Sequence, residues 1–118
     1  MEETFASLRQ VMLENAPEMV VAKDEPGNLS LETPWANPRK PKEAMWFGGV
    51  KLGKAYVAYH LMPIYTDAEL AGAISETLKA RQQGKSCFNF KSIDADQIKE
   101  LASLTAACAA AYARAPGD

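Results

Sequence analysis

The chain lacks several features that mark common functional classes. Its 118 residues include a single histidine and two cysteines, and they contain no run of 18 or more apolar residues. With one histidine, a single chain cannot form the two-histidine metal sites that hold zinc or non-haem iron. Without a long apolar run, no membrane-spanning helix is predicted, so we expect no membrane partner.

The chain also lacks a strong overall charge. It carries 13 basic and 15 acidic residues, for a net charge of −2. No overall basic field is therefore present to hold nucleic acid by counterion release, and nucleic-acid binding is disfavoured. The charge is uneven, because residues 1–32 carry seven acids and two bases, whereas residues 39–54 carry five bases and one acid.

The start of the chain and its cysteines indicate a cytoplasmic protein. Residues 1–4, Met-Glu-Glu-Thr, are acidic, whereas a secretory signal begins with basic and then apolar residues. Without an export signal, we expect Cys87 and Cys108 to stay reduced and to pack as small core residues.

The first third of the chain predicts a helix and a hairpin. Helical spacing of apolar residues begins after Thr4, a suitable N-cap, and Pro17 ends it. Residues 19–24 and 29–32 predict two strands joined by a Pro-Gly-Asn turn. Residues 34–42 contain three prolines among basic residues, which predicts an exposed extended loop.

Residues 44–51 and 55–62 form the strongest predicted hairpin, because aromatic and β-branched residues flank a short turn at residues 52–54. Alternation divides the second strand between two faces, with Tyr56 and His60 on one face and Tyr59 on the other. The pattern leaves open which of these faces meets the core.

Two short helices are predicted next, one capped by Thr66 over residues 67–72 and one that starts at Ser75 and ends near Gly84. Residues 86–91 then predict a strand, with Phe88 and Phe90 on one side.

The last predicted element is a long helix. Asp94 and Gln97 have the spacing of a capping box, and an apolar stripe runs from Ile98 to Tyr112. Together the elements predict one α+β domain over residues 1–118, with an antiparallel sheet of about five strands and amphipathic terminal helices that need a surface to cover.

One motif resembles a phosphate-binding loop and fails on inspection. Gly48, Gly53 and Lys54 have the required spacing, but Ala55 stands where a hydroxyl must bind magnesium, and a strand follows where a helix is needed. Nucleotide-phosphate binding is therefore disfavoured.

His60 and Cys87 are the residues best suited to chemistry. A histidine within an apolar strand is typical of a half-buried, hydrogen-bonded ring. The alternative is that His60 acts as a base toward a Cys87 nucleophile, since both lie on predicted strands. Stacking residues and the polar side chains around Cys87 complete the candidate ligand-binding set: Trp46, Tyr56, His60, Lys85, Cys87, Asn89 and Lys91.

The acidic N-terminal third offers oxygen ligands for a hard metal ion, with a solvated surface as the alternative. The candidate metal ligands are Glu14, Glu18, Asp24 and Glu25. The basic middle offers an anion-binding patch or, again, a solvated surface. Its members are Arg39, Lys40, Lys42, Lys51 and Lys54.

Three segments carry a family resemblance: residues 56–65, Tyr-Val-Ala-Tyr-His-Leu-Met-Pro-Ile-Tyr, then Leu78-Lys79, and residues 84–90, Gly-Lys-Ser-Cys-Phe-Asn-Phe. Over about residues 44–113 the chain resembles the YdhG-like family of bacterial proteins (domain of unknown function 1801). The resemblance implies a compact α+β domain with helices packed on one face of an antiparallel sheet. The family includes a member described as a frataxin-like iron chaperone, so the resemblance implies iron binding as one function, and no cofactor is assigned.

No residue pattern specifies a reaction, so no catalytic residue is assigned. The sequence favours a small cytoplasmic domain that binds a protein or small-molecule ligand, with weak iron binding as its most concrete version. The alternatives are a small enzyme or thiol sensor using Cys87, and a protein-interaction module or homodimer. The surface expected for the last of these is aromatic and consists of Trp46, Phe47, Tyr56 and Tyr59.

Overall fold

The structure, a computed structural model, describes residues 1–116. Its elements in chain order are α1 (Glu2–Asn15), β1 (Val20–Glu25), β2 (Asn28–Asn37), β3 (Lys40–Leu52), β4 (Val57–Leu61), α2 (Met62–Thr66), α3 (Ala68–Gly72), α4 (Glu76–Lys79), β5 (Gln82–Gln83), β6 (Cys87–Phe90) and α5 (Ala95–Ala111).

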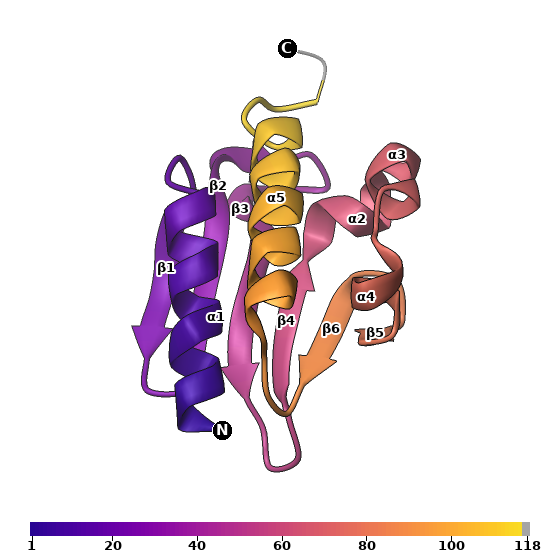
Figure 1. Cartoon of the computed structure of the whole chain (residues 1–118). Coiled ribbons are helices and arrows are strands. Elements are labelled where there is room, and N and C mark those ends of the chain that lie inside the picture. The colour runs from indigo at the N-terminus through magenta and orange to yellow at the C-terminus, as the bar shows by residue number, and fades with distance from the viewer. Residues whose placement is uncertain (117–118) are drawn as a thin grey trace.

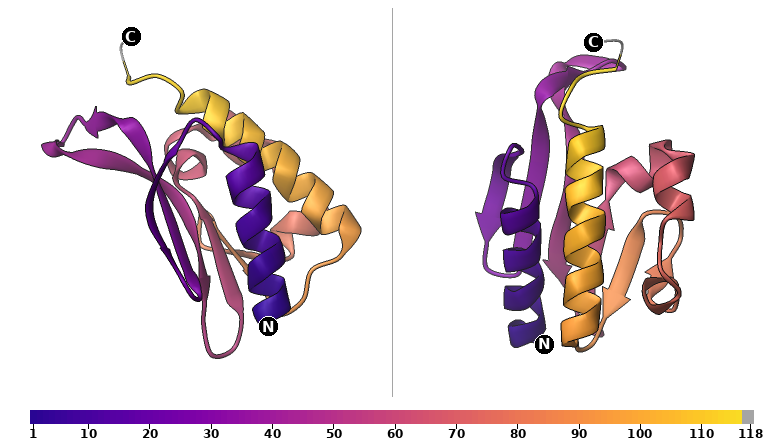
Figure 2. Two further views of the ribbon diagram at one scale, coloured as in Figure 1. Left: turned by 90° about the vertical axis from the view of Figure 1, so that its left-hand side faces the viewer. Right: turned by 45° about the horizontal axis from the view of Figure 1, so that its top comes forward.

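The strands form one antiparallel sheet in the order β1-β2-β3-β4-β6-β5. The helices α1 and α5 lie side by side across one face of this sheet, and the other face carries no helix of the described chain (Figures 1 and 2). The predicted α+β class with an antiparallel sheet is confirmed. The sheet has six strands because the two-residue strand β5, which the sequence did not predict, pairs with β6.

The core lies between the sheet and the two long helices, and it decides which face of β4 is buried. Val57, Tyr59 and Leu61 are fully buried, whereas His60 is half-buried on the opposite face. Inside the core, the hydroxyls of Tyr59 and Thr105 form a hydrogen bond of 2.6 Å. The bond satisfies two polar groups that would otherwise be buried without partners, and it connects the centre of the sheet to the middle of α5.

The two long helices begin in different ways. The predicted capping box of α5 is confirmed, because Asp94 accepts from the Gln97 amide and the Gln97 side chain accepts from the Asp94 amide. The prediction that Thr4 caps α1 is wrong. Thr4 lies inside the first turn, buried against the sheet, and its hydroxyl donates to the main-chain oxygen of Lys91 at 3.2 Å.

The prediction for the proline-rich segment is also wrong. The sequence predicts a loop over residues 34–42, but β2 continues to Asn37 and β3 starts at Lys40, so this segment is the tip of a long hairpin. The register of β2 and β3 is irregular between Glu32 and Asn37. Prolines are tolerated at such irregularities because their missing N–H groups do not break a regular ladder.

Two turn residues have roles other than those predicted. Gly84 does not end a helix, because α4 ends at Lys79 and Gly84 adopts a positive φ of 71° in the tight turn between β5 and β6. The cap of α3 is Asp67 and not Thr66, which belongs to α2, a helix that the sequence did not predict. The predicted cap at Ser75 is confirmed, because its hydroxyl accepts from the Leu78 amide.

A steric constraint in β3 gives a stability prediction. A Cβ atom on Gly49 would lie 2.5 Å from the main-chain oxygen of Leu29, whereas one on Gly72 would meet nothing within 4 Å. We therefore expect Gly49→Ala to lower the free energy of unfolding by about 1–3 kcal/mol, and Gly72→Ala to change it by less than about 1 kcal/mol. Urea unfolding followed by circular dichroism measures both, and equal stabilities would contradict the close approach of β2 and β3.

Candidate functional site

Four of the predicted ligand-binding residues gather on the helix-free face of the sheet. They are Trp46, His60, Cys87 and Asn89, and we call them the open-face row. His60 on β4 pairs directly with Cys87 on β6, so their side chains are cross-strand neighbours. The sequence left the pairing of His60 with Cys87 as an alternative, and the register now makes the two residues neighbours.

Trp46 spans this face from β2 to β4. Its indole Nε1 donates to the hydroxyl of Ser30 at 2.9 Å, and its ring lies 5.7 Å from the His60 ring. Gly49 pairs with both Ser30 and His60 in the register. Since glycine has no side chain, it leaves room for the indole between these two residues.

The protonation of the open-face row does not favour catalysis. Burial lowers the pKa of His60 and raises the pKa of the Cys87 thiol, so both groups favour their neutral forms at pH 7. The Cys87 thiol lies 3.5 Å from the Asn89 side-chain oxygen and is placed to donate to it. A nucleophilic cysteine needs the opposite shift, toward a thiolate beside a protonated base.

The other three predicted residues lie away from this row. Tyr56 precedes β4 and is exposed. Lys85 and Lys91 flank the two ends of β6, and the Lys85 ammonium lies 5.3 Å from the centre of the Tyr65 ring.

The predicted metal ligands do not form a cluster. Asp24 pairs with Arg9 at 2.6 Å, which lowers the pKa of the carboxyl through the hydrogen bond, and Glu14 accepts from Gln10 at 2.7 Å. Within residues 1–116, no group of three or more His, Cys, Asp or Glu side chains is placed to hold a metal ion. Iron binding by Glu14, Glu18, Asp24 and Glu25 therefore stays a prediction, and no grouping of these side chains supports it.

Two predicted surface patches are divided by the fold. Phe47 and Tyr59 of the aromatic surface are fully buried. Alternation in β4 turns Tyr59 toward the helices, whereas Phe47 lies at a register shift between β2 and β3, where Leu31 pairs with Gly48 and Glu32 with Trp46. The basic residues separate along β3, where Lys42 and Lys51 are about 30 Å apart at the usual rise per residue.

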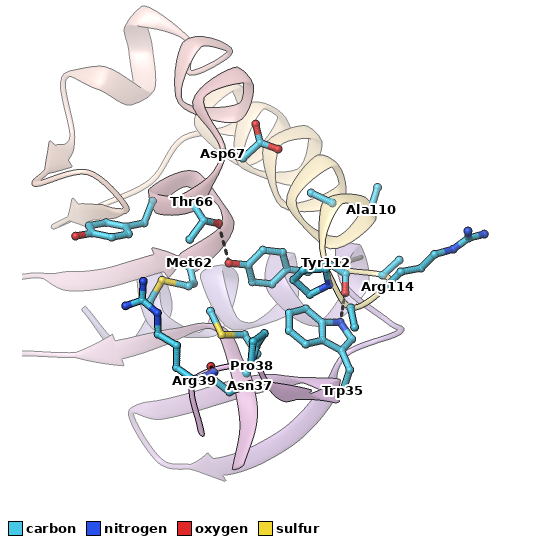
Figure 3. A pocket seen from close by; sticks show the side chains of 16 residues that line it. Trp35, Asn37, Pro38, Arg39, Met62, Thr66, Asp67, Ala110, Tyr112 and Arg114 are labelled. Atoms are coloured by element: carbon cyan, nitrogen blue, oxygen red, sulfur yellow. Dashed lines mark hydrogen bonds between the residues drawn. The ribbon is translucent and has the colours of Figure 1, made fainter. Parts of the chain in front are cut away.

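A concave region lies elsewhere, at the end of the sheet. We call it the end cleft, a cavity of about 860 Å³ between the tip of the β2–β3 hairpin, the segment from α2 to Asp67, and the C-terminal end of α5 (Figure 3). Its lining residues are Trp35, Asn37, Pro38, Arg39, Met45, Met62, Tyr65, Thr66, Asp67 and the residues numbered 110–116.

Hydrogen bonds hold the aromatic wall of the end cleft in place. The indole N–H of Trp35 donates to the main-chain oxygen of Tyr112 at 2.8 Å, and the two rings meet edge to face with centroids 5.5 Å apart. The hydroxyls of Tyr112 and Thr66 lie 2.8 Å apart (Figure 3). Burial raises the pKa of Tyr112, which stays neutral.

Sequence patterns did not indicate the end cleft. Trp35 lies in the segment predicted to be a loop, and Tyr112 has the spacing of an ordinary core residue of the last helix. Met45 and Met62 fall in predicted strands whose ends carry no motif. The end cleft exists because three segments that are distant in sequence meet, and no local pattern predicts their meeting.

Comparisons with known proteins add no assignment, since no family model, curated protein or solved structure matches the chain. Fold and geometry thus define the class, an α+β domain with one helix-covered sheet face and an apolar cleft at the sheet end. No helix in residues 1–116 combines the length and apolarity needed to cross a membrane.

The burial of His60 gives a pH prediction. Because its pKa is lower in the folded chain than in the unfolded chain, acid favours unfolding. This contribution to stability is fully present above the unfolded-state pKa of about 6.5, and it is lost as the pH falls through the folded-state pKa. We expect the imidazole proton resonances to titrate at lower pH in the native protein than in urea.

The control for this prediction is His60→Gln, which removes the titrating group from the same strand position. The free energy of unfolding of this variant should change less between pH 7 and pH 5.5 than that of the unmodified chain. A native midpoint at or above the midpoint in urea would contradict the burial of His60.

Proposed function

We propose that the chain is a non-enzymatic binding domain that holds a small, largely apolar molecule in the end cleft. The observation that carries the proposal is the cavity of about 860 Å³ with aromatic and methionine walls. Binding sites for small molecules are commonly concave, largely apolar and about 300–1,000 Å³ in volume.

The walls combine a fixed part with an adaptable part. Trp35 and Tyr112 are held by the hydrogen bonds described above, so little side-chain freedom is lost when a ligand packs against them. Met45 and Met62 lie on the same cavity, and unbranched thioether side chains adjust to ligands of different shape. This combination suits a ligand of moderate size.

The alternative functions have less support. A thiol enzyme or sensor needs a reactive Cys87, and burial moves the pKa of this thiol in the unreactive direction. Membership of the YdhG-like family of bacterial proteins and frataxin-like iron binding remain proposals that rest on the resemblance of residues 56–65, 78–79 and 84–90. A cytoplasmic location is a separate proposal from the sequence.

Homodimer formation is a second candidate, favoured by the edge strand β1. Its Val20 and Val21 are 45% and 48% exposed, and an unpaired edge with apolar side chains can pair with another strand. Light scattering at increasing protein concentration should show dimers that Val21→Lys abolishes. A strict monomer at every concentration would remove this candidate.

Ligand binding in the end cleft is testable with the neutral dye N-phenyl-1-naphthylamine, whose fluorescence rises in apolar surroundings. Ala111 is exposed at the end of α5 and lines the end cleft. We expect Ala111→Trp to fill part of the cavity and to weaken saturable dye binding at least about tenfold, a loss of about 1.4 kcal/mol.

Ala106→Trp is the matched control, because Ala106 is exposed on the same helix and does not line the end cleft. Circular dichroism checks that both variants remain folded. Absence of saturable binding to the unmodified chain, or equal binding by the two variants, would overturn the proposed function.

A further inference from the structure

The polar groups that line the end cleft divide into those already bonded and those left free. The Trp35 N–H and the hydroxyls of Thr66 and Tyr112 have partners within the protein. Asp67 uses its Oδ1 to cap α3, accepting from the amides of Glu69 at 2.9 Å and Leu70 at 3.4 Å. The indole N–H and the two hydroxyls maintain the walls, whereas Oδ2 of Asp67 has no hydrogen-bond partner among the described residues.

The groups left free are mainly donors. Neither Arg39 nor Arg114 forms an ion pair or a side-chain hydrogen bond with any other described residue. The Asn37 side chain accepts from the Arg39 amide at 3.0 Å through Oδ1, so its amide nitrogen remains a donor. The lining thus contains two guanidiniums and one carboxylate, and one oxygen of that carboxylate caps α3.

Of the two arginines, Arg39 has the more suitable position to bind a ligand in the end cleft. It lies in the turn between β2 and β3, where the bond from its amide to Asn37 holds the main chain. Its guanidinium lies beside Met62 at the mouth of the end cleft, whereas the Arg114 side chain extends away from Tyr112 toward solvent (Figure 3).

We propose that the ligand of the end cleft is an anion, a small carboxylate with an apolar body, and that its carboxylate binds the guanidinium of Arg39. The inference rests on the proposed function. A guanidinium presents paired N–H donors whose geometry matches the two oxygens of a carboxylate. The apolar body then packs against the methionines and the Trp35–Tyr112 wall.

Three probes with the same ring test the class of ligand: 2-naphthoate, 2-naphthamide and 2-naphthylmethylammonium, which are anionic, neutral and cationic. Each is titrated into the full chain while amide resonances are followed by NMR. We expect all three to shift resonances of the end cleft, and 2-naphthoate to bind about three- to tenfold more tightly than 2-naphthamide.

The variant Arg39→Gln should abolish this preference without weakening 2-naphthamide. Lys40→Gln is its matched control, because Lys40 is the adjacent residue, carries the same charge and does not line the end cleft. A change caused only by net charge would appear equally in both variants and would overturn the role of Arg39.

The possible failures are distinguishable. If 2-naphthoate and 2-naphthamide bind equally well, or if the ammonium probe binds best, the anion inference is overturned while the proposed function stands. If none of the three probes shifts the end-cleft resonances, both are overturned. A preference for 2-naphthoate that only Arg39→Gln removes supports the inference.

Discussion

The buried hydrogen bond between Tyr59 and Thr105 sets the position of the last helix, on which the end cleft depends. It joins β4, in the interior of the sheet, to the middle of α5. Tyr112 follows Thr105 by seven residues, or about two helical turns, and therefore lies on the same stripe of the helix. That spacing carries Tyr112 past the end of β4, where it meets Thr66 and Trp35. Displacing α5 would separate all of these contacts together.

The end cleft is the result of strands of unequal length. β3 runs over 13 residues, whereas its partner β4 has five, so the β2–β3 hairpin extends beyond the helix-covered part of the sheet (Figure 2). If the extended hairpin did not contact α5, the indole N–H of Trp35 would lack its hydrogen-bond partner. Its bond to the main chain of Tyr112 ties the hairpin to the end of α5. The same geometry places Arg39 at the hairpin turn, where it forms no ion pair with any residue in the range 1–116 and its charge is available to a ligand.

The open-face row shows how residues of types that often take part in catalysis can stabilise the structure instead. Trp46 bonds to Ser30 and its ring lies tilted beside the His60 ring, and it thereby covers a stretch of sheet in which Gly49 has no side chain. The covering partly removes His60 from water, which keeps the ring neutral. A neutral imidazole beside a protonated thiol stabilises packing without supplying a nucleophile.

The sequence by itself determined the features that depend on neighbouring residues. Alternation identified the β3–β4 hairpin and the Phe88–Phe90 strand, and the spacing of Asp94 and Gln97 identified the start of α5. Local patterns failed where pairing overrides propensity, as in the proline-rich hairpin tip and at Gly84. Alternation also placed His60 and Cys87 each on one face of a strand, but only the register made them neighbours. The tertiary structure alone decided the end cleft, because Trp35, Met62 and Tyr112 come from separate elements whose meeting depends on strand length and helix position.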